Sequence, residues 1–439
     1  MFFSLPGVHA PHRKNTAASP SQIMPVPSSV TIPMQMHIGK PARPIVKVGD
    51  KVHVGTLIAE ADGFVSSPIH ASVSGTVSKL IDIPTSSGAK CPAVVIESDG
   101  EMSMDPALTA PEVNTKDELI AAIRAAGIVG LGGAGFPTHV KFSVPEGKSA
   151  ECLVINGAEC EPYITSDTRT MIERTDDIAY AIDKIVSIMQ IPRVIIGIEA
   201  NKPEAISAMK ALSLNNPAVE VKVLPSLYPQ GGEKVIVYHT TGKVVAAGRL
   251  PIDVGCIVCN CTTIAEIGRY LKTGMPLVAK CLTVDGSAVK SPVNLVVPIG
   301  TSVGDVFAFA GGFSKDPEKV LYGGPMMGVA IASLDAPVLK NTNALLALTA
   351  KDMNEKKQTA CIRCGNCTTH CPFNLTPLAM LKAYNRGDME ALDRLRVDIC
   401  MECGCCSFIC PAAQPLAQTN RLAKAALREY KKSKEKENK

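Results

Sequence analysis

The C-terminal part of this chain is organised by two similar strings of sequence, C-I-R-C-G-N-C-T-T-H-C-P at residues 361–372 and C-M-E-C-G-C-C-S-F-I-C-P at residues 400–411. Both have the spacing Cys-x2-Cys-x2-Cys-x3-Cys-Pro. Thiolates at two-residue intervals on a tight loop reach one inorganic cluster, while the fourth thiolate, released by its proline, points elsewhere. This repeat predicts a compact domain built around two metal clusters.

The same spacing holds two 4Fe–4S clusters in two-cluster bacterial ferredoxins, where the fourth cysteine of each string binds the other cluster. We therefore expect crossed ligation. One cluster is held by Cys361, Cys364, Cys367 and Cys410, and the other by Cys400, Cys403, Cys406 and Cys371. Cys405 is out of phase and is expected to be a spare thiol. Structural zinc, which also binds at sites made from Cys-x2-Cys pairs, is the alternative.

The residues around the two strings are expected to shield the clusters from water. Residues 375–385 and 388–398 have helical periodicity, so two helices should lie between the strings. His370, next to Cys371, is interpreted as a surface or supporting residue rather than a ligand. The sequence therefore predicts a mostly helical domain at this end.

Length and composition indicate a folded protein with several domains. The chain has 439 residues, of which 46% are hydrophobic and 20% are charged, and it is too long for one core of ordinary size. The net charge is +4, with the cations concentrated in residues 428–439, so no nucleic-acid-binding surface is expected.

The positions of the cysteines and the lengths of the apolar runs indicate in which cellular compartment the protein is expected. Nine of the sixteen cysteines lie between residues 361 and 410, which favours metal binding in a reducing cytoplasm over a disulfide framework. The opening M-F-F-S-L-P-G lacks the basic region and the long apolar stretch of a signal peptide. Because no run of about 18 apolar residues occurs, no membrane-spanning helix is expected.

Short strands are expected between residues 32 and 96, where Val- and Ile-rich runs alternate with Gly, Pro and Asp. Residues 46–60 and 69–80 resemble the two halves of a lipoyl/biotinyl-type barrel-sandwich domain, which carries a modified lysine at a hairpin tip. Residues 61–67, which would form this tip, contain no lysine. We therefore interpret this part as a structural or docking module rather than a swinging prosthetic arm.

A new domain is expected to begin at Thr115, the N-cap of a helix with Glu118 at the capping-box position and Gly127 at its end. Apolar runs then alternate with helical stretches, which predicts a layered α/β domain. The runs are at residues 152–155, 194–198 and 219–224, and the stretches are at residues 176–189 and 202–212.

A glycine-rich string, G-L-G-G-A-G-F-P-T-H-V-K at residues 130–141, is a candidate phosphate-binding loop, because glycines let backbone N–H groups approach a phosphate. It fits neither the dinucleotide fingerprint nor a P-loop. The string I-N-G-A-E-C-E-P-Y-I-T-S-D-T-R at residues 155–169 places Asn156, Glu159 and Glu161 at a strand exit, where ligands commonly bind in α/β sheets. A plain glycine turn and solvated carboxylates are the alternatives.

Together with Y-P-Q-G-G-E-K at residues 228–234 and C-N-C-T-T at residues 259–263, these strings resemble the flavin- and NADH-binding subunit of respiratory complex I in composition and order. Over nearly its full length the chain resembles the RnfC family, the peripheral subunits of ion-translocating Rnf complexes that pass electrons between NADH and ferredoxin. The opening G-V-H-A-P at residues 7–11, the lysine-less barrel-sandwich segment and the cysteine strings follow that family's order.

The resemblance implies two 4Fe–4S clusters, a non-covalently bound FMN, and NAD(H) as substrate. It implies that the FMN phosphate is cradled by Gly132, Gly133, Gly135 and Lys141, and that the flavin is surrounded by Asn156, Tyr228, Asn260 and Thr263. Glu161 and Glu233 would be the catalytic residues near the nicotinamide nucleotide, with Glu159 beside them. One departure is Gly232, which stands where the complex I subunit has the first of two adjacent glutamates.

The implied architecture is multidomain α/β. It comprises a barrel-sandwich domain at residues 1–114, an FMN/NADH-binding α/β domain at 115–275, a soluble-ligand-binding β-grasp domain at 276–350, a helical two-cluster ferredoxin-like domain at 351–427 and a charged tail at 428–439. No chemistry is assigned to the β-grasp domain. The cysteines outside the two strings, such as Cys152, Cys160 and Cys256, are interpreted as small buried residues, as are Cys259, Cys261 and Cys281.

The resemblance also implies a function. The chain would be the electron-input subunit of an Rnf complex, with NADH dehydrogenase activity, on the cytoplasmic side of the bacterial cell membrane. Its partners would be other Rnf subunits, including an iron–sulfur partner, with ferredoxin reached indirectly. The alternatives are a soluble relative that feeds a reductase, and a passive electron-transfer or docking subunit without NADH activity.

Overall fold

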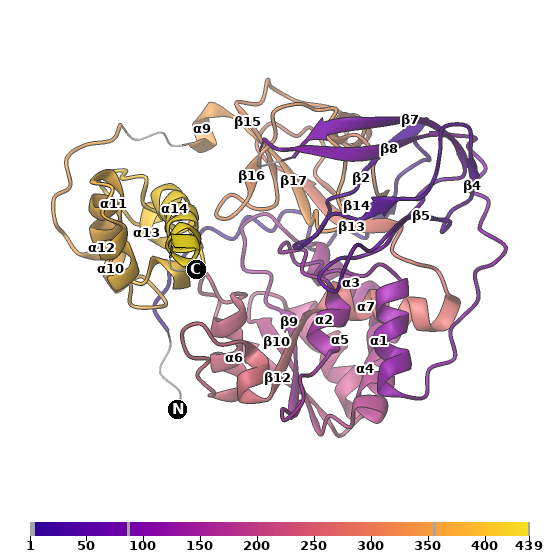
Figure 1. The fold of residues 1–439 in the computed structure, drawn as a ribbon, viewed down its shortest axis with the longest axis horizontal. Coiled ribbons are helices and arrows are strands. Elements are labelled where there is room, and N and C mark those ends of the chain that lie inside the picture. Colours follow the sequence, from indigo (N-terminus) through magenta and orange to yellow (C-terminus); the bar gives the residue numbers. More distant parts are fainter. Residues whose placement is uncertain (1–4, 86–87, 354–356, 438–439) are drawn as a thin grey trace.

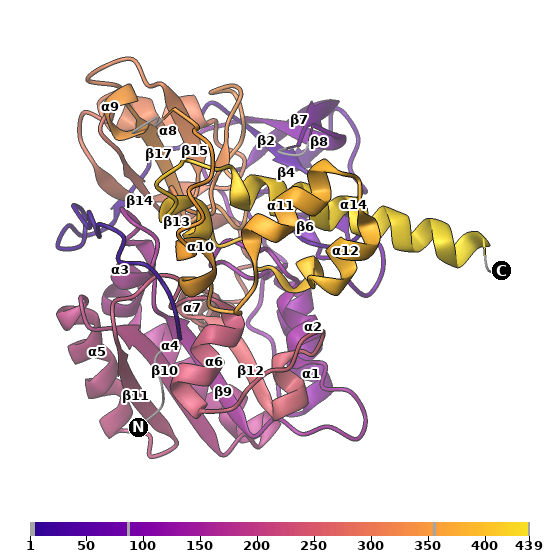
Figure 2. The ribbon, with the colours of Figure 1, turned by 90° about the vertical axis from the view of Figure 1, so that its left-hand side faces the viewer.

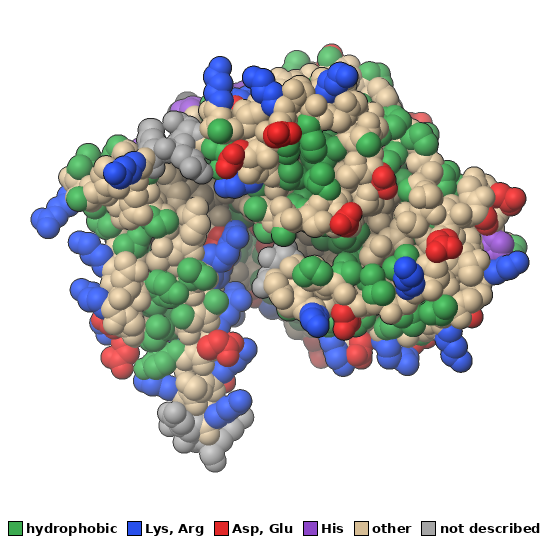
Figure 3. Space-filling model, turned by 90° about the horizontal axis from the view of Figure 1, so that it is seen from above, with side chains coloured by type: hydrophobic (Ala, Val, Ile, Leu, Met, Phe, Trp, Pro, Cys, Tyr) green, Lys and Arg blue, Asp and Glu red, His purple; other side chains and the backbone are tan. Residues whose placement is uncertain are grey.

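The computed structural model describes residues 5–85, 88–353 and 357–437. The expectation of no signal peptide concerns an opening string whose residues 1–4 lie outside the described ranges. The barrel-sandwich, α/β and β-grasp parts pack into one body, and the C-terminal part stands beside it as a separate lobe (Figure 1). Many Lys and Arg side chains lie on the surface of this lobe (Figure 3).

The N-terminal part is a barrel-sandwich of two antiparallel sheets, as expected. One sheet has the strand order β2-β8-β7-β4 and the other has the order β3-β5-β6. The strands are β2 Ser29–Pro33, β3 Arg43–Pro44, β4 Lys51–Val52, β5 Leu57–Glu60, β6 Ile69–His70, β7 Gly75–Pro84 and β8 Lys90–Ser98. Alternate residues of β2 and β8, namely Val30, Ile32, Val94 and Ile96, are buried in the core, as the two-residue period of a strand requires.

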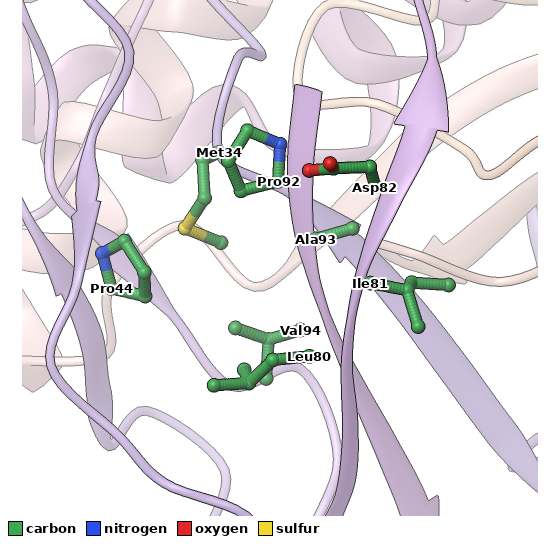
Figure 4. Close-up of a pocket in the computed structure, with 8 residues that line it drawn as sticks. All are labelled: Met34, Pro44, Leu80, Ile81, Asp82, Pro92, Ala93 and Val94. Atoms are coloured by element: carbon green, nitrogen blue, oxygen red, sulfur yellow. The ribbon is translucent and has the colours of Figure 1, made fainter. Parts of the chain in front are cut away.

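A cavity of about 210 Å³ opens on this domain beside β7 and β8 (Figure 4). Its wall is mostly apolar, with Met34, Leu80 and Val94 among the lining residues. Among the described residues of this wall, Asp82 supplies the single ionisable side chain. One carboxylate in an apolar wall forms no acid–base pair, so this cavity carries no candidate chemistry.

The second part is a layered α/β domain around a parallel sheet with the order β11-β10-β9-β12. Its strands are β9 Cys152–Gly157, β10 Arg193–Glu199, β11 Val219–Leu224 and β12 Cys256–Asn260. Its helices are α1 Lys116–Ala125, α2 Thr138–Phe142, α3 Ser166–Glu173, α4 Thr175–Met189, α5 Pro203–Leu214, α6 Glu233–Thr241, the 3₁₀ turn η1 Pro251–Val254, and α7 Cys261–Thr273. The predicted capping box of Thr115 and Glu118 is present at α1.

Both faces of this sheet are covered by helices. Leu153 and Ile155 of β9 belong to the core that includes α4 and α7, whereas Val154 between them belongs to the core beneath α6. The chain runs from β9 outward to β10 and β11 and then returns to the other side of β9 as β12. Such a reversal leaves a crevice outside the carboxyl ends of the central strands, where open α/β sheets bind ligands.

The β-grasp part is built on a mixed sheet with the order β1-β14-β13-β17-β15-β16. Its strands are β1 Gln22–Ile23, β13 Ala279–Asp285, β14 Val293–Pro298, β15 Lys319–Tyr322, β16 Val329–Ala330 and β17 Ala344–Leu348, and its helices are α8 Val303–Phe309 and α9 Ala350–Met353. β1 comes from the N-terminal segment and pairs in parallel with β14. Residues 22–23 are therefore built into a sheet whose other strands come much later in the sequence.

The C-terminal lobe is helical and carries both cysteine strings. Its helices are α10 Asn366–Thr369, α11 Pro377–Asn385, α12 Met389–Arg394, the 3₁₀ turn η2 Val397–Ile399, α13 Cys405–Phe408 and α14 Leu416–Glu437. The two helices predicted between the strings are α11 and α12, and they share a core of Met380, Leu392 and Leu427 with α14. Residues 428–437, expected to be a charged tail, continue α14 as a helix that projects from the lobe (Figure 2).

Candidate functional site

A cavity of about 510 Å³ lies at the carboxyl ends of β9 and β12. This volume is in the usual range for cofactor pockets. The α/β domain forms most of its wall, the β-grasp part contributes turns around Gly324 and Asn341, and the C-terminal lobe contributes Met401. The cavity is therefore shared by three parts of the chain.

Most of the predicted site residues meet at this cavity. Those in its wall are Gly132, Gly133, Lys141, Asn156, Glu159, Glu161, Tyr228, Glu233 and Asn260. Gly135 and Thr263 lie outside the wall. Thr263 supports the glycine loop from behind, because its Oγ1 accepts a hydrogen bond from Leu131 N at 3.0 Å.

The glycine loop has the backbone that a phosphate cradle requires. Gly133 and Gly135 have φ angles of +117° and +66°, a region that L side chains rarely adopt. A Cβ atom on Gly132 would come within 3.0 Å of Asn260 Nδ2. Asn341 of the β-grasp part donates a hydrogen bond from its Nδ2 to Gly133 O at 2.6 Å, so the loop is held from outside its own domain.

Lys141 and Glu233, predicted to bind different ligands, bind each other in this structure. Lys141 Nζ lies 2.6 Å from Glu233 Oε1 and donates to Val258 O at 2.9 Å. Burial acts to lower the pKa of Lys141, but the Glu233 carboxylate and Cys259 together outweigh it, so the pKa is raised overall. The lysine is therefore charged and points into the wall of the cavity.

Glu159 is bonded to the start of α3. Its carboxylate accepts hydrogen bonds from Asp167 N at 2.6 Å and from Thr168 Oγ1 at 2.5 Å. Burial raises the pKa of Glu159 to about 7. Asp167 in turn accepts from Asn260 Nδ2 at 2.6 Å, so Glu159 and Asn260 belong to one network at the ends of β9 and β12.

Glu161 and Tyr228 connect the α/β domain to its neighbours. The Glu161 carboxylate accepts hydrogen bonds from Met326 N at 3.0 Å and from Met327 N at 2.9 Å, both in the β-grasp part. Burial raises the pKa of Glu161 to about 7, against the opposing effect of these donors. The Tyr228 hydroxyl donates to Cys403 O in the C-terminal lobe at 2.7 Å. Two predicted ligand residues thus also hold domains together.

Sequence reasoning missed the contribution of the β-grasp part. Tyr322, Gly324 and Asn343 line the cavity, together with Asn341, which also bonds the glycine loop. The string Y-G-G-P-M-M-G at residues 322–328 was the available signal, since closely spaced glycines allow a backbone to approach a ligand. Asp167 and Cys160, also in the wall, lie in the quoted string at residues 155–169 but received no binding role.

The cysteine strings come together in the C-terminal lobe. A small cavity there is lined by Cys371 of the first string and by Cys400, Cys403 and Cys406 of the second. Cys367 of the first string and Cys410 of the second pack against one apolar cluster, which also contains Cys406 of the second string. Cys371, the fourth cysteine of the first string, therefore lies with the second string.

The spare cysteine is not at the surface. Cys405 is buried, and its Sγ lies 3.8 Å from the backbone oxygen of Tyr228, a residue that lines the cavity at the ends of β9 and β12. His370 bonds through Nδ1 to Asn366 O at 2.9 Å, as a supporting residue would. Among the cysteines interpreted as small buried residues, Cys160 and Cys281 are only partly buried. The other four are fully buried: Cys152, Cys256, Cys259 and Cys261.

Comparison with protein families divides the chain in the same way. The RnfC barrel sandwich hybrid domain matches residues 4–101, and the Nuo51 FMN-binding domain matches residues 123–269. The SLBB domain matches residues 282–330, and a 4Fe-4S dicluster domain matches residues 353–422. The chain thus contains an FMN-binding domain and a domain for two 4Fe–4S clusters.

Curated relatives cover most of the chain. A component of the proton-translocating ferredoxin:NAD(+) oxidoreductase complex of Clostridium ljungdahlii is 43% identical, covering 87% of this chain and 84% of the relative. The chain belongs to the RnfC family. The corresponding component of the Na(+)-translocating complex of Acetobacterium woodii is 42% identical and covers 87% of each chain. That of the ion-translocating oxidoreductase complex of Rhodobacter capsulatus is 40% identical, covering 96% of this RnfC-family chain and 83% of its own.

A solved structure shares part of the fold. The NAD+-reducing [NiFe]-hydrogenase in its air-oxidized state superposes with a TM-score of 0.51 at 17% identity, covering 71% of this RnfC-family chain and 63% of the hydrogenase chain. Within residues 5–85, 88–353 and 357–437, no helix is both long enough and apolar enough to span a membrane.

Proposed function

We propose that this chain is the electron-input subunit of a membrane-bound ion-translocating ferredoxin:NAD+ oxidoreductase, exchanging electrons between NADH and ferredoxin. We call the cavity at the ends of β9 and β12 the FMN-type cavity, and the cavity lined by Cys371, Cys400, Cys403 and Cys406 the cysteine cavity. The main observation in support of this proposal is that these two cavities adjoin each other. Tyr228 lines the first cavity and donates its hydroxyl to Cys403 O at the second, and Met401 lines both. The relatives' names and the matched cofactor domains support the same assignment.

When bound, FMN would supply the link between a two-electron hydride donor such as NADH and one-electron carriers such as 4Fe–4S clusters. The residues present fit FMN. The glycine loop and Lys141 suit its phosphate, while Asn156 and Asn260 present amide groups from the ends of β9 and β12. Tyr228 supplies an aromatic face between the flavin side and the lobe.

The residues that contact the nicotinamide nucleotide in this proposal are Glu161 and Glu233. Glu233 is the first residue of α6 and is paired with Lys141 in this structure. A phosphate at the glycine loop competes for the same ammonium group, because both partners are anions. A bound phosphate would accept the remaining N–H donor of Lys141 and weaken its pairing with Glu233, whose carboxylate would then be available to the nucleotide.

We propose that the thiols hold two cubanes with crossed ligation, as the spacing of the two strings predicts. The thiols of Cys371, Cys400, Cys403 and Cys406 share the cavity nearer the flavin site. Cys364 of the other set is exposed, so that cluster would face a separate iron–sulfur partner. We propose that this partner is another subunit of the complex, on the cytoplasmic side of the membrane, and that ferredoxin is reached through it.

An anaerobic NADH titration of protein carrying FMN and both clusters tests this function. Bleaching of the flavin and cluster absorbance at stoichiometric NADH is the expected result. No bleaching would leave the passive electron-transfer subunit as the function. Bleaching by NADH without electron transfer to membranes that contain the other subunits would instead favour a soluble relative.

A further inference from the structure

A lysine outside the predicted site lies beneath the loop that carries the site's carboxylates. Lys14 Nζ donates hydrogen bonds to three backbone carbonyls: Glu159 O at 2.7 Å, Glu161 O at 2.8 Å and Ile164 O at 2.6 Å. An ammonium group has three N–H donors, and here each has an acceptor. One side chain therefore fixes the loop of residues 159–164 at both ends and in the middle.

The loop has a backbone that needs such support. Glu159 and Tyr163 have φ angles of +46° and +71°, in the left-handed region that residues other than glycine rarely occupy. Its carbonyl groups converge on Lys14 instead of on solvent, and unpaired carbonyls in this position would be costly. Burial lowers the pKa of Lys14 to about 8, so the group still carries its third proton at neutral pH.

The segment that carries Lys14 is fixed on both sides. We call residues 7–16 the strap. On one side of Lys14, Val8 and Tyr228 exchange two backbone hydrogen bonds of 2.8 and 3.0 Å. On the other side, the hydroxyls of Thr16 and Thr165 are 2.6 Å apart. The strap is thus fixed on both sides of Lys14 and holds its ammonium group against the loop.

The loop in turn orients groups in the wall of the cavity. Glu159 bonds Asp167 N, and Asp167 bonds Asn260 at the end of β12. Glu161 accepts the two β-grasp amides of Met326 and Met327. A shift of the loop backbone therefore moves both sides of the cavity.

We infer that Lys14 is a positioning residue for the flavin site, acting through the backbone of residues 159–164. The inference rests on the proposed function. Lys14 lies in the matched RnfC barrel sandwich region, residues 4–101, outside the matched FMN-binding domain, residues 123–269. The flavin site of this chain thus depends on a residue that its flavin domain does not contain.

Titration of FMN into apoprotein, followed by quenching of flavin fluorescence, tests the inference. Lys14→Met keeps most of the length of the side chain and removes the three donors, so FMN should bind about 10- to 100-fold more weakly. Lys14→Arg restores donors and should recover part of the loss. Asn15→Ala is the matched control, because Asn15 lies on the strap but bonds Asp285 of the β-grasp sheet instead of the loop.

Iron content and NADH kinetics separate positioning from a general loss of structure. We expect iron content equal to that of the parent, and in FMN-loaded protein a raised KM for NADH with kcat little changed. If Lys14→Met is insoluble, the FMN affinities of Lys14→Arg and Asn15→Ala are compared instead, and a weaker affinity of Lys14→Arg supports the inference. Equal FMN affinities for the Lys14 variants and the Asn15→Ala control would overturn this inference but leave the proposed function standing. Failure of the parent apoprotein to bind FMN would overturn the proposed function and this inference with it.

Discussion

The two cavities of this protein are built in opposite ways. The cysteine cavity takes its thiols from two short strings with fixed spacing, inside one lobe. The FMN-type cavity takes its wall from three parts of the chain, and some of its polar groups are held by partners in other domains, as Glu161 is by Met326 and Met327. Substitution of a thiol should therefore abolish a cluster, whereas substitutions around the flavin should weaken binding by degrees.

The largest effect is expected for the cysteine that crosses between the strings. The parent should contain about eight iron atoms and eight acid-labile sulfides, because each cubane holds four of each. Cys371→Ser should lose the cluster held with Cys400, Cys403 and Cys406, leaving about four iron atoms. Paramagnetic resonance of the reduced protein would identify the signal that disappears.

Cys405→Ser is the matched control for that experiment, because Cys405 is buried beside the same cavity but is out of phase with the ligand spacing. Its iron content should equal that of the parent. Loss of the Cys361 cluster in Cys371→Ser would show uncrossed ligation. Zinc in place of iron after anaerobic reconstitution would end the cluster assignment.

The next largest effect is expected for substitution of Lys141, which tests the phosphate cradle. Lys141→Ala should weaken FMN binding about 10- to 100-fold, the value of a charge-assisted hydrogen bond, while iron content stays the same. FMN should be released from the parent by acid precipitation, since it is bound non-covalently. Lys148→Ala, which removes an ion pair with Asp253 on the same domain, should leave FMN binding unchanged. Equal loss of FMN and iron in Lys141→Ala would instead indicate misfolding.

An effect of comparable size is expected for the nucleotide. Glu233→Gln should raise the NADH concentration needed for ferricyanide reduction about 5- to 150-fold, because a lost hydrogen bond costs about 1–3 kcal/mol. FMN content should not fall, since Glu233 competes with the phosphate for Lys141. Glu220→Gln, at an exposed ion pair with Arg193, is the control. An unchanged NADH requirement would remove Glu233 from the nucleotide site.

The smallest effect concerns pH. Burial raises the pKa of Glu161 from 4.5 to about 7. Between these values the folded protein binds a proton that the unfolded chain does not, so this carboxyl contributes most to stability below pH 4.5, and the contribution falls as the pH rises to 7.

The temperature at which bound flavin is released, followed by its fluorescence, measures this dependence. From about pH 5 to about pH 7 the release temperature of the parent should decline more steeply than that of Glu161→Gln. Glu101→Gln changes an exposed carboxylate and should decline as the parent does. Parallel curves for the parent and Glu161→Gln would contradict the assignment of a protonated, buried Glu161.

The features that sequence predicted are local ones. The cysteine spacing, the capping box of Thr115 and Glu118, and the apolar run that became β11 all depend on residues close together in the chain. The glycine loop was found for the same reason, although Gly135 lies just outside the cavity wall. Short-range patterns carry this information because turns, caps and strand periods are fixed by neighbouring residues.

The features that sequence missed depend on packing between domains. Nothing in the string around Glu161 shows that its carboxylate meets the amides of Met326 and Met327, 165 and 166 positions away. The pairing of Lys141 with Glu233 lies within the α/β domain, but it too joins residues far apart in the chain, because it requires α2 and α6 to meet. The β-grasp part was given no role because its contact with the cavity exists only after both domains have folded.

The strap has a consequence for the order in which the protein is made. Thr16 O accepts a hydrogen bond from Asn294 Nδ2, and these residues are 278 positions apart. A ribosome delivers the strap first and β14 much later, while domains generally fold as they emerge. The α/β sheet can therefore form early, but the strap is fully seated, with Lys14 held under its loop, only once the β-grasp strands have left the ribosome. FMN loading should thus be a late step in biosynthesis.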